Sequence, residues 1–169
     1  MNRAASGITG DSDIVVIGSQ AVLGQFPDAP AALLVSMEAD VFPQKHPDLA
    51  IQIDGAIGER SLFHETFGYY AHGVDETTAT LPTGWTERLV RLQNENTGGA
   101  TGWCLEVHDL AISKLVAGRE KDLDFVRVLL RERMVLGEIL AARLASLPVS
   151  QDRVQMVGGR LSRLLGVGA

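Results

Sequence analysis

Residues 13–43 read DIVVIGSQAVLGQFPDAPAALLVSMEADVFP, and this stretch decides the fold. It opens with a β-branched apolar run, residues 14–17, which is typical of a buried strand and ends at Gly18. The second apolar run, residues 33–42, predicts another strand, which Pro43 closes. The two runs and the segment between them together predict a strand–helix–strand arrangement.

The connecting segment is expected to start a helix at residues 20–23, which Pro27 and Pro30 then end. Its entry, Gly18 followed by Ser19, permits a tight turn, and a helix that begins there directs backbone N–H groups towards an anion. Taken alone, this feature fits a plain strand-to-helix turn equally well.

Two carboxylates interrupt the second apolar run. Alternate side chains of a strand face the same side, so Ser36, Glu38 and Asp40 are expected to share one face. Neighbouring carboxylates repel each other and are costly to bury unless a divalent cation neutralises them. Mg²⁺ prefers such oxygen ligands. For this pair alone, a solvent-exposed strand face is the simpler interpretation. A functional site is indicated only by the order along the chain, in which the Gly18-Ser19 turn precedes the two carboxylates.

The charge is unevenly distributed over the 169 residues, whose formal net charge is -6. Residues 1–100 contain 5 Lys and Arg against 13 Asp and Glu, and residues 101–169 contain 10 against 8. The acidic first part argues against a broad nucleic-acid footprint, whereas the second part leaves room for a local basic site.

The chain has no apolar run long enough to span a bilayer, and its first residues lack the apolar core of a secretory signal. Its single cysteine, Cys104, cannot form an internal disulfide. We therefore expect a cytoplasmic protein.

The remainder of the first part predicts short elements. Residues 46–58 favour a helix, with Pro47 near its start and Gly58 at its stop. Short strand-like pieces follow between residues 67 and 92, namely GYYAHGV, TTATL and TERLVRL. Residues 94–102 predict a hairpin loop, and residues 104–107 a strand.

Helical patterns fill the last third. They cover residues 109–118, with Asp109 as N-cap, then residues 122–147 and, beyond Pro148, residues 150–165. Strands followed by helices indicate an α+β fold, with a mixed sheet and flanking helices. We expect a sheet region over residues 1–108 and a helical region over residues 109–169, packed together as one compact unit.

The order of motifs resembles the nucleotidyltransferase superfamily, whose signature is hG[GS] followed by [DE]h[DE]h. The matching residues are Ile17-Gly18-Ser19 and Glu38-Ala39-Asp40-Val41. The segment DLAISKLVAGREKDLDF, residues 109–125, is similar to the downstream motif of abortive-infection-type nucleotidyltransferases, which include toxins of toxin–antitoxin pairs. The segment GERSLFHETFGYYAHGV, residues 58–74, is similar to a related family of uncharacterised bacterial proteins.

This resemblance implies a site for Mg²⁺ and a nucleoside triphosphate. Glu38 and Asp40 would hold the metal, and Lys114 would neutralise phosphate charge. Asp122 would activate an attacking hydroxyl or orient Lys114. The implied catalytic residues are Glu38, Asp40, Lys114 and Asp122, and the implied nucleotide-binding residues are Gly18, Ser19, Ser36, Lys114 and Arg119. For the third acidic residue common in the superfamily, Asp54, Glu106 and Asp122 all remain candidates.

The resemblance implies transfer of a nucleotide to a hydroxyl acceptor. That acceptor would be RNA such as tRNA, with the protein acting as a toxin beside a cognate antitoxin, or another hydroxyl-bearing molecule. Two alternatives belong to other classes: a catalytically inactive domain for nucleotide sensing or protein interaction, and a subunit whose C-terminal helices dock on a partner. The histidines show no metal-ligand spacing, and for His64 we expect a structural role.

Overall fold

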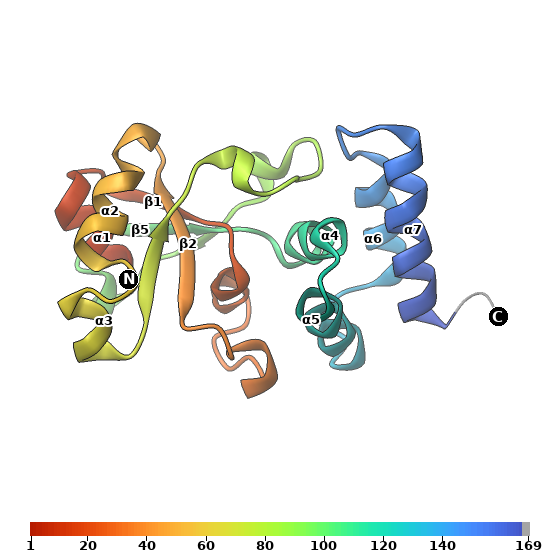
Figure 1. Ribbon diagram of the computed structural model, residues 1–169, viewed down its shortest axis with the longest axis horizontal. Coiled ribbons are helices and arrows are strands. Elements are labelled where there is room, and N and C mark those ends of the chain that lie inside the picture. The colour runs from red at the N-terminus through yellow and green to blue at the C-terminus, as the bar shows by residue number, and fades with distance from the viewer. Residues whose placement is uncertain (167–169) are drawn as a thin grey trace. The chain divides into compact units, whose positions relative to one another are not determined.

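The computed structural model describes residues 1–166 and divides into two compact units (Figure 1). The first comprises Met1–Thr78 and Arg88–Glu106, and the second comprises Ala79–Glu87 and the chain from Val107 onwards. Whether the two predicted regions pack as one compact unit stays a prediction. The α+β fold class is confirmed, with a mixed sheet, flanking helices and a helical C-terminal region.

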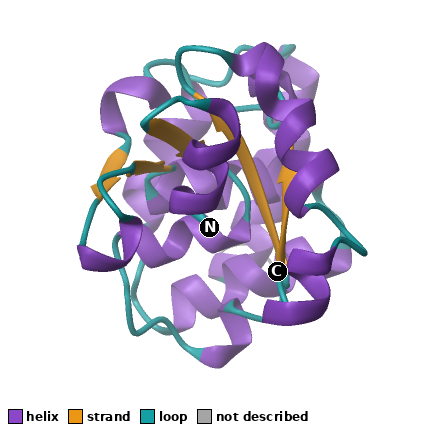
Figure 2. Cartoon of the chain, turned by 90° about the vertical axis from the view of Figure 1, so that its left-hand side faces the viewer, coloured by secondary structure: helices purple, strands orange, loops and turns teal. Residues whose placement is uncertain are grey.

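All five strands, orange in Figure 2, belong to the first unit. The sheet has the order β3-β2-β1-β5-β4. β1 pairs parallel with β5 and antiparallel with β2, whereas β2 pairs parallel with β3, which leaves β3 at one edge. β4 and β5 form the predicted antiparallel hairpin. The strands are β1 (Asp13–Val16), β2 (Glu38–Pro43), β3 (Tyr70–Gly73), β4 (Val90–Leu92) and β5 (Thr101–Cys104).

Three α-helices accompany this sheet: α1 (Asn2–Thr9), α2 (Ala50–Ile57) and α3 (Leu62–Phe67). α1 and α2 contact each other and the strands β1 to β3, as Figure 1 shows. The core between them contains Ile14, Val41 and Ile53, all fully buried. The predicted helix at residues 46–58 is confirmed, since Pro47 opens a single 3-10 turn that leads into α2.

The second unit is built from four helices: α4 (Val107–Ala117), α5 (Glu120–Arg131), α6 (Gly137–Ala145) and α7 (Gln151–Leu165). α4 is apolar on most of its surface and contacts the other three helices. Leu110, Leu115 and Leu140 are fully buried there. α4 is therefore the central helix of this unit.

The strand predicted over residues 33–42 is wrong in its first half. β2 begins only at Glu38, after a 3-10 turn at Ala31–Leu33. The Ser36 hydroxyl accepts from the Glu38 N–H and donates to the Glu38 carbonyl, both at 3.2 Å. Such local side-chain bonds compete with the pairing of a strand. Ser36 therefore lies before β2 and does not share the strand face of the two carboxylates.

Other boundaries were also predicted wrongly. The helix after Gly18 is a 3-10 helix, Ser19–Gly24, and TTATL contains a 3-10 turn instead of a strand. The strand predicted at residues 104–107 ends at Cys104, because α4 already begins at Val107. The remaining 3-10 turns are Trp85–Arg88 and Glu95–Thr97.

The helix predicted over residues 122–147 is in fact α5 and α6. Between them Arg133 has a positive φ of 57°, which ends α5, and the Leu136 N–H donates to Nε2 of His108 at 3.1 Å. Asp109 is not an N-cap, because it lies inside the first turn of α4. Its buried carboxylate pairs with Nε of Arg143 at 3.2 Å, and this ion pair joins α4 to α6.

Gly73 of β3 lies against the backbone of α2. A Cβ at this position would lie 1.9 Å from the carbonyl oxygen of Ala50, which cannot move unless α2 moves. Gly73→Ala is therefore expected to lower the free energy of unfolding by about 1–3 kcal/mol or more. Urea unfolding checks this. In the matched control, Gly55→Ala, the new methyl group meets nothing within 4 Å, and we expect a gain of about 0.5–1 kcal/mol. Equal effects of the two substitutions would contradict the packing argument.

Candidate metal and nucleotide site

Glu38 and Asp40 lie in the first half of strand β2, on the same face. Ala39 and Val41 alternate with them and are buried on the other face, which fixes the strand's rotation. The two carboxylate side chains remain partly accessible, with 37% and 27% of their surfaces exposed. The predicted sharing of one strand face by these two residues therefore agrees with the burial pattern.

Gly18 lies directly against Asp40. A Cβ on Gly18 would lie 2.1 Å from Oδ2 of Asp40, so no residue with a side chain fits beside this carboxylate as it stands. The backbone joins the same two segments, because the Ile17 N–H donates to the Asp40 carbonyl at 3.0 Å. The turn after β1 and the carboxylates of β2 thus form one local arrangement.

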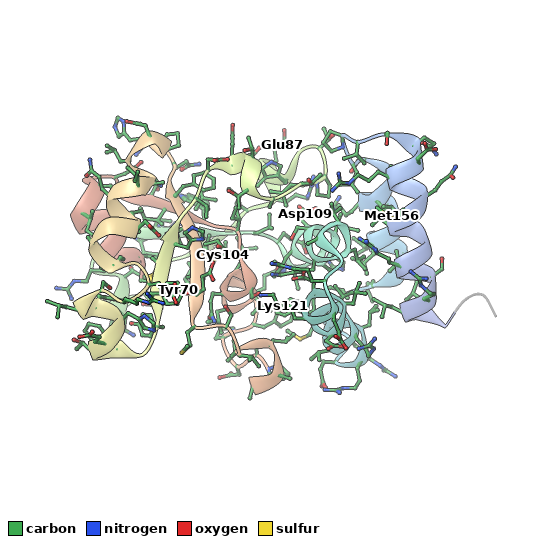
Figure 3. The ribbon with its side chains drawn as sticks, in the orientation of Figure 1. Tyr70, Glu87, Cys104, Asp109, Lys121 and Met156 are labelled. Atoms are coloured by element: carbon green, nitrogen blue, oxygen red, sulfur yellow. The ribbon has the colours of Figure 1, made fainter. Side chains whose placement is uncertain are left out.

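The edge strand β3 adds two side chains to this arrangement. In the parallel pairing of β2 with β3, Tyr70 lies opposite Glu38 and His72 lies opposite Asp40. The Tyr70 hydroxyl, labelled in Figure 3, donates to Oε2 of Glu38 at 3.1 Å. Nδ1 of His72 lies 3.1 Å from Oε1 of Glu38 and 3.5 Å from Oδ1 of Asp40.

The carboxylate of Glu38 is kept ionised by its neighbours. Partial burial alone would raise its pKa, but hydrogen bonds from Tyr70 and His72 favour the ionised form, and the pKa lies below its ordinary value. The pKa of Tyr70 is raised by burial and by the charge of Glu38, so the phenol keeps its proton and remains a donor.

Two carboxylates and one imidazole, all possible metal ligands, lie close together here. The candidate ligand atoms of Glu38, Asp40 and His72 all lie within 4.8 Å of one another. Asp54, Glu106 and Asp122, the candidates for a third acidic residue of the superfamily, do not belong to this group. His72 was not predicted from the sequence, although Tyr70-x-His72 repeats the alternation of Glu38-x-Asp40. Only the strand pairing shows that the two alternations lie side by side.

The second unit contains a cation–carboxylate cluster of its own. Nζ of Lys114, on α4, lies 3.6 Å from Oδ1 of Asp122 and 5.6 Å from the ring centre of Phe125. Nε of Arg119 donates to Oδ2 of Asp122 at 2.6 Å. The Lys114 side chain is only 14% exposed, which distinguishes it from an ordinary solvent-exposed helix lysine.

The ionisation of Asp122 follows from this cluster. Burial alone would raise the pKa of this carboxylate, which is 2% exposed, but the Arg119 hydrogen bond and the charge of Lys114 lower it below its ordinary value. A carboxylate with a lowered pKa is a weak base. The 3.6 Å contact with Nζ of Lys114 fits the implied role of orienting that lysine, whereas activating a hydroxyl would need a stronger base.

The remaining residues named from the sequence have local roles. Ser19 begins the 3-10 helix after Gly18, and the side chain of Ser36 is bonded to the backbone of Glu38. Arg119 is the N-cap residue of α5, with 62% of its side chain exposed. Nδ1 of His64 accepts from the Arg60 N–H at 3.0 Å, as a structural histidine does.

The comparison with protein-family models decides the family. Residues 2–154 match the model of a family described as nucleotidyltransferase of unknown function (DUF6036). The chain belongs to this family. The searches of curated proteins and of solved structures found no match.

Membership of this nucleotidyltransferase family confirms the resemblance seen in the sequence. The matched residues include both hG[GS] and [DE]h[DE]h as well as Lys114 and Asp122. Among residues 1–166, no helix has the length and apolarity needed to cross a membrane. That Lys114 neutralises phosphate charge stays a prediction.

The contact of Gly18 with Asp40 can be tested directly. Gly18 has ordinary backbone angles, so Gly18→Ala should fold, but its methyl group would push the Asp40 carboxylate aside. We expect Mg²⁺-dependent affinity for a nucleoside triphosphate to fall by about tenfold or more, a loss of about 1.4 kcal/mol, with little change in melting temperature. Calorimetry measures the affinity. Gly7→Ala, whose Cβ meets nothing within 4 Å, is the control. Unchanged affinity in Gly18→Ala would show that the position of Asp40 is unimportant for binding.

Proposed function

We propose that this protein is a Mg²⁺-dependent nucleotidyltransferase, which transfers a nucleotide from a nucleoside triphosphate to a hydroxyl acceptor. One observation carries the proposal: the glycine of the hG[GS] turn packs against the second carboxylate of the [DE]h[DE]h strand. Two motifs separated by a long connection thus meet at one place. The partly exposed carboxylates are accessible to a ligand.

The residues present fit a divalent cation. Carboxylate oxygens of Glu38 and Asp40 are hard, anionic donors of the kind that Mg²⁺ prefers, and their mutual repulsion falls when a cation is bound. When bound, the ion would neutralise phosphate charge and polarise the phosphoryl oxygens. Gly18 and Ser19 would lie against the phosphates, because the chain there has no bulky side chain.

Lys114 is proposed to neutralise the triphosphate as a point charge. Its low exposure and its contact with Asp122 restrict the rotamers of a side chain that is otherwise flexible. In the proposed reaction the acceptor oxygen bonds to the α-phosphorus and pyrophosphate leaves. Asp122, held by Arg119, would act as a positioning residue that orients Lys114.

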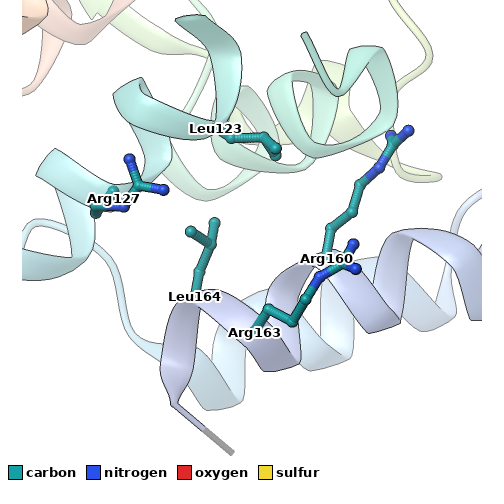
Figure 4. A pocket seen from close by; sticks show the side chains of 5 residues that line it. All are labelled: Leu123, Arg127, Arg160, Arg163 and Leu164. Atoms are coloured by element: carbon teal, nitrogen blue, oxygen red, sulfur yellow. The ribbon is translucent and has the colours of Figure 1, made fainter. Parts of the chain in front are cut away.

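A basic pocket in the second unit supports an RNA acceptor such as tRNA. Arg127 of α5 and Arg160 and Arg163 of α7 surround it, together with Leu123 and Leu164 (Figure 4). Arg160 donates to the carbonyl oxygens of Leu115 and Val116, and Arg127 pairs with Asp124. Arg163 is therefore the guanidinium that we propose as a contact for a phosphodiester backbone. We propose that the protein acts on such RNA in the cytoplasm as the toxin of a pair, neutralised by a cognate antitoxin protein.

Nucleotide incorporation tests the reaction. The purified protein is incubated with Mg²⁺, each labelled nucleoside triphosphate and tRNA with an intact or a periodate-oxidised 3′ end. We expect labelling only of RNA with an intact 3′ hydroxyl. Asp40→Asn should abolish labelling, because it removes a proposed metal ligand. Lys114→Ala should weaken triphosphate binding by about 1.5–3 kcal/mol, the contribution of a charge-assisted hydrogen bond.

The matched control for Lys114 is Lys121→Ala, since Lys121 is an exposed lysine of α5 (Figure 3). It should bind and label as the wild type does. Mg²⁺-dependent nucleotide binding without labelling of any acceptor would favour the alternative function, a nucleotide-sensing domain without turnover. Absence of nucleotide binding would contradict both functions and leave the partner-docking role.

The acceptor has its own test at the basic pocket. Arg163 is exposed on α7, so Arg163→Gln should leave the fold intact. We expect about a threefold to tenfold weaker affinity for tRNA and a shallower salt dependence, because one fewer phosphate contact forms. Arg153→Gln, an exposed arginine on the same helix that does not line the pocket, is the control. Fluorescence anisotropy at two salt concentrations measures both variants. Equal behaviour of the two would exclude the pocket as an RNA contact.

A further inference from the structure

We propose that His72 is a third, nitrogen-donating ligand of the metal site, and that it makes the site bind a first-row transition ion such as Mn²⁺ in preference to Mg²⁺. The inference rests on the proposed function, because it concerns the metal that Glu38 and Asp40 would hold. Nothing in the two family motifs points to His72, which lies on a different strand.

The distances are those of a ligand set. Two neighbouring ligands of an octahedral ion with bonds of 2.0–2.1 Å lie about 2.9 Å apart. Nδ1 of His72 lies 3.1 Å from Oε1 of Glu38 and 3.5 Å from Oδ1 of Asp40. The imidazole nitrogen and one oxygen from each carboxylate can therefore reach a common ion with small side-chain movements, once the Nδ1 proton that bonds to Glu38 has left this nitrogen.

Each of the three side chains is positioned by the fold. The Tyr70 hydroxyl binds Oε2 of Glu38, which leaves Oε1 directed towards His72. Gly18 confines the Asp40 carboxylate on its other side. The β2–β3 register places His72 directly opposite Asp40. Such supporting contacts around ligands are typical of metal sites, where they orient the ligand atoms.

A purely structural role explains the arrangement less well. The His72 side chain is 49% exposed, and an exposed ion pair contributes about 0–1 kcal/mol at most to stability. Two carboxylates and an imidazole within ligand distance on an accessible strand face are better explained by a shared ion. Mg²⁺ binds almost entirely through oxygen, whereas imidazole is a good ligand for transition ions. His72 should therefore raise affinity for Mn²⁺ much more than for Mg²⁺.

The experiment measures metal binding on the full chain without nucleotide. The Mn²⁺ affinity comes from the electron paramagnetic resonance signal of free Mn²⁺, and the Mg²⁺ affinity comes from competition. Pulsed resonance of bound Mn²⁺ detects a directly bonded nitrogen. For the wild type we expect a ¹⁴N coupling. For His72→Ala we expect this coupling to be lost. The Mn²⁺ affinity should fall on the order of tenfold to a hundredfold, whereas the Mg²⁺ affinity should fall by less than about threefold. His46→Ala, which removes an exposed histidine elsewhere, should change nothing.

The outcomes separate this inference from the proposed function. Mn²⁺ binding that is lost in Asp40→Asn but shows no ¹⁴N coupling in the wild type would overturn the role of His72 alone. Equal losses of Mn²⁺ and Mg²⁺ affinity in His72→Ala would also overturn the selectivity. Mn²⁺ binding that is insensitive to Asp40→Asn, or no metal binding at all, would overturn both proposals. The wild-type spectrum decides the ligand even if His72→Ala folds poorly.

Discussion

The contact between Gly18 and Asp40 is the constraint on which the site depends. A carboxylate oxygen of Asp40 occupies the space that a Cβ at Gly18 would need, so glycine at this position lets the carboxylate keep its place beside the turn after β1. The backbone bond from Ile17 to Asp40 secures the same approach. β1 lies between β2 and β5 in the sheet, so hydrogen bonds on both sides hold the strand that leads into the Gly18 turn.

In the second unit, charged side chains are paired with each other inside the unit. There two buried carboxylates contact cations: Asp109 pairs with Arg143, and Asp122 contacts both Lys114 and the more exposed Arg119. Removal of one partner from a buried pair leaves an uncompensated charge, which costs about 3–5 kcal/mol. These pairs therefore fix α5 and α6 relative to α4 and hold the proposed cation, Lys114, in one place. Glu38 and Asp40 of the first unit are partly exposed, as the proposed binding of a ligand requires.

The edge strand β3 shows how residues outside the hG[GS] and [DE]h[DE]h motifs come to lie beside the two carboxylates. Tyr70 and His72 come from a strand at the edge of the sheet, and its register with β2 aligns them with Glu38 and Asp40. Gly73, the next residue, lets β3 lie close to α2. The packing of a helix against the sheet thus sets where the imidazole lies. In the proposed metal site, an imidazole beside two carboxylates would broaden the range of ions that can bind.

The sequence by itself determined the α+β class, the strand at β1, the helix α2 and the alternation of Glu38 with Asp40, because these follow from local periodicity and from turn residues. It placed the start of β2 and the ends of β5 and α5 wrongly, because Ser36, Val107 and His108 act through bonds or packing that composition does not reveal. Only the tertiary structure brought His72 to the carboxylates and buried Asp109 against Arg143. Strand register and helix packing join residues far apart in the chain, and no local pattern records which of them will meet.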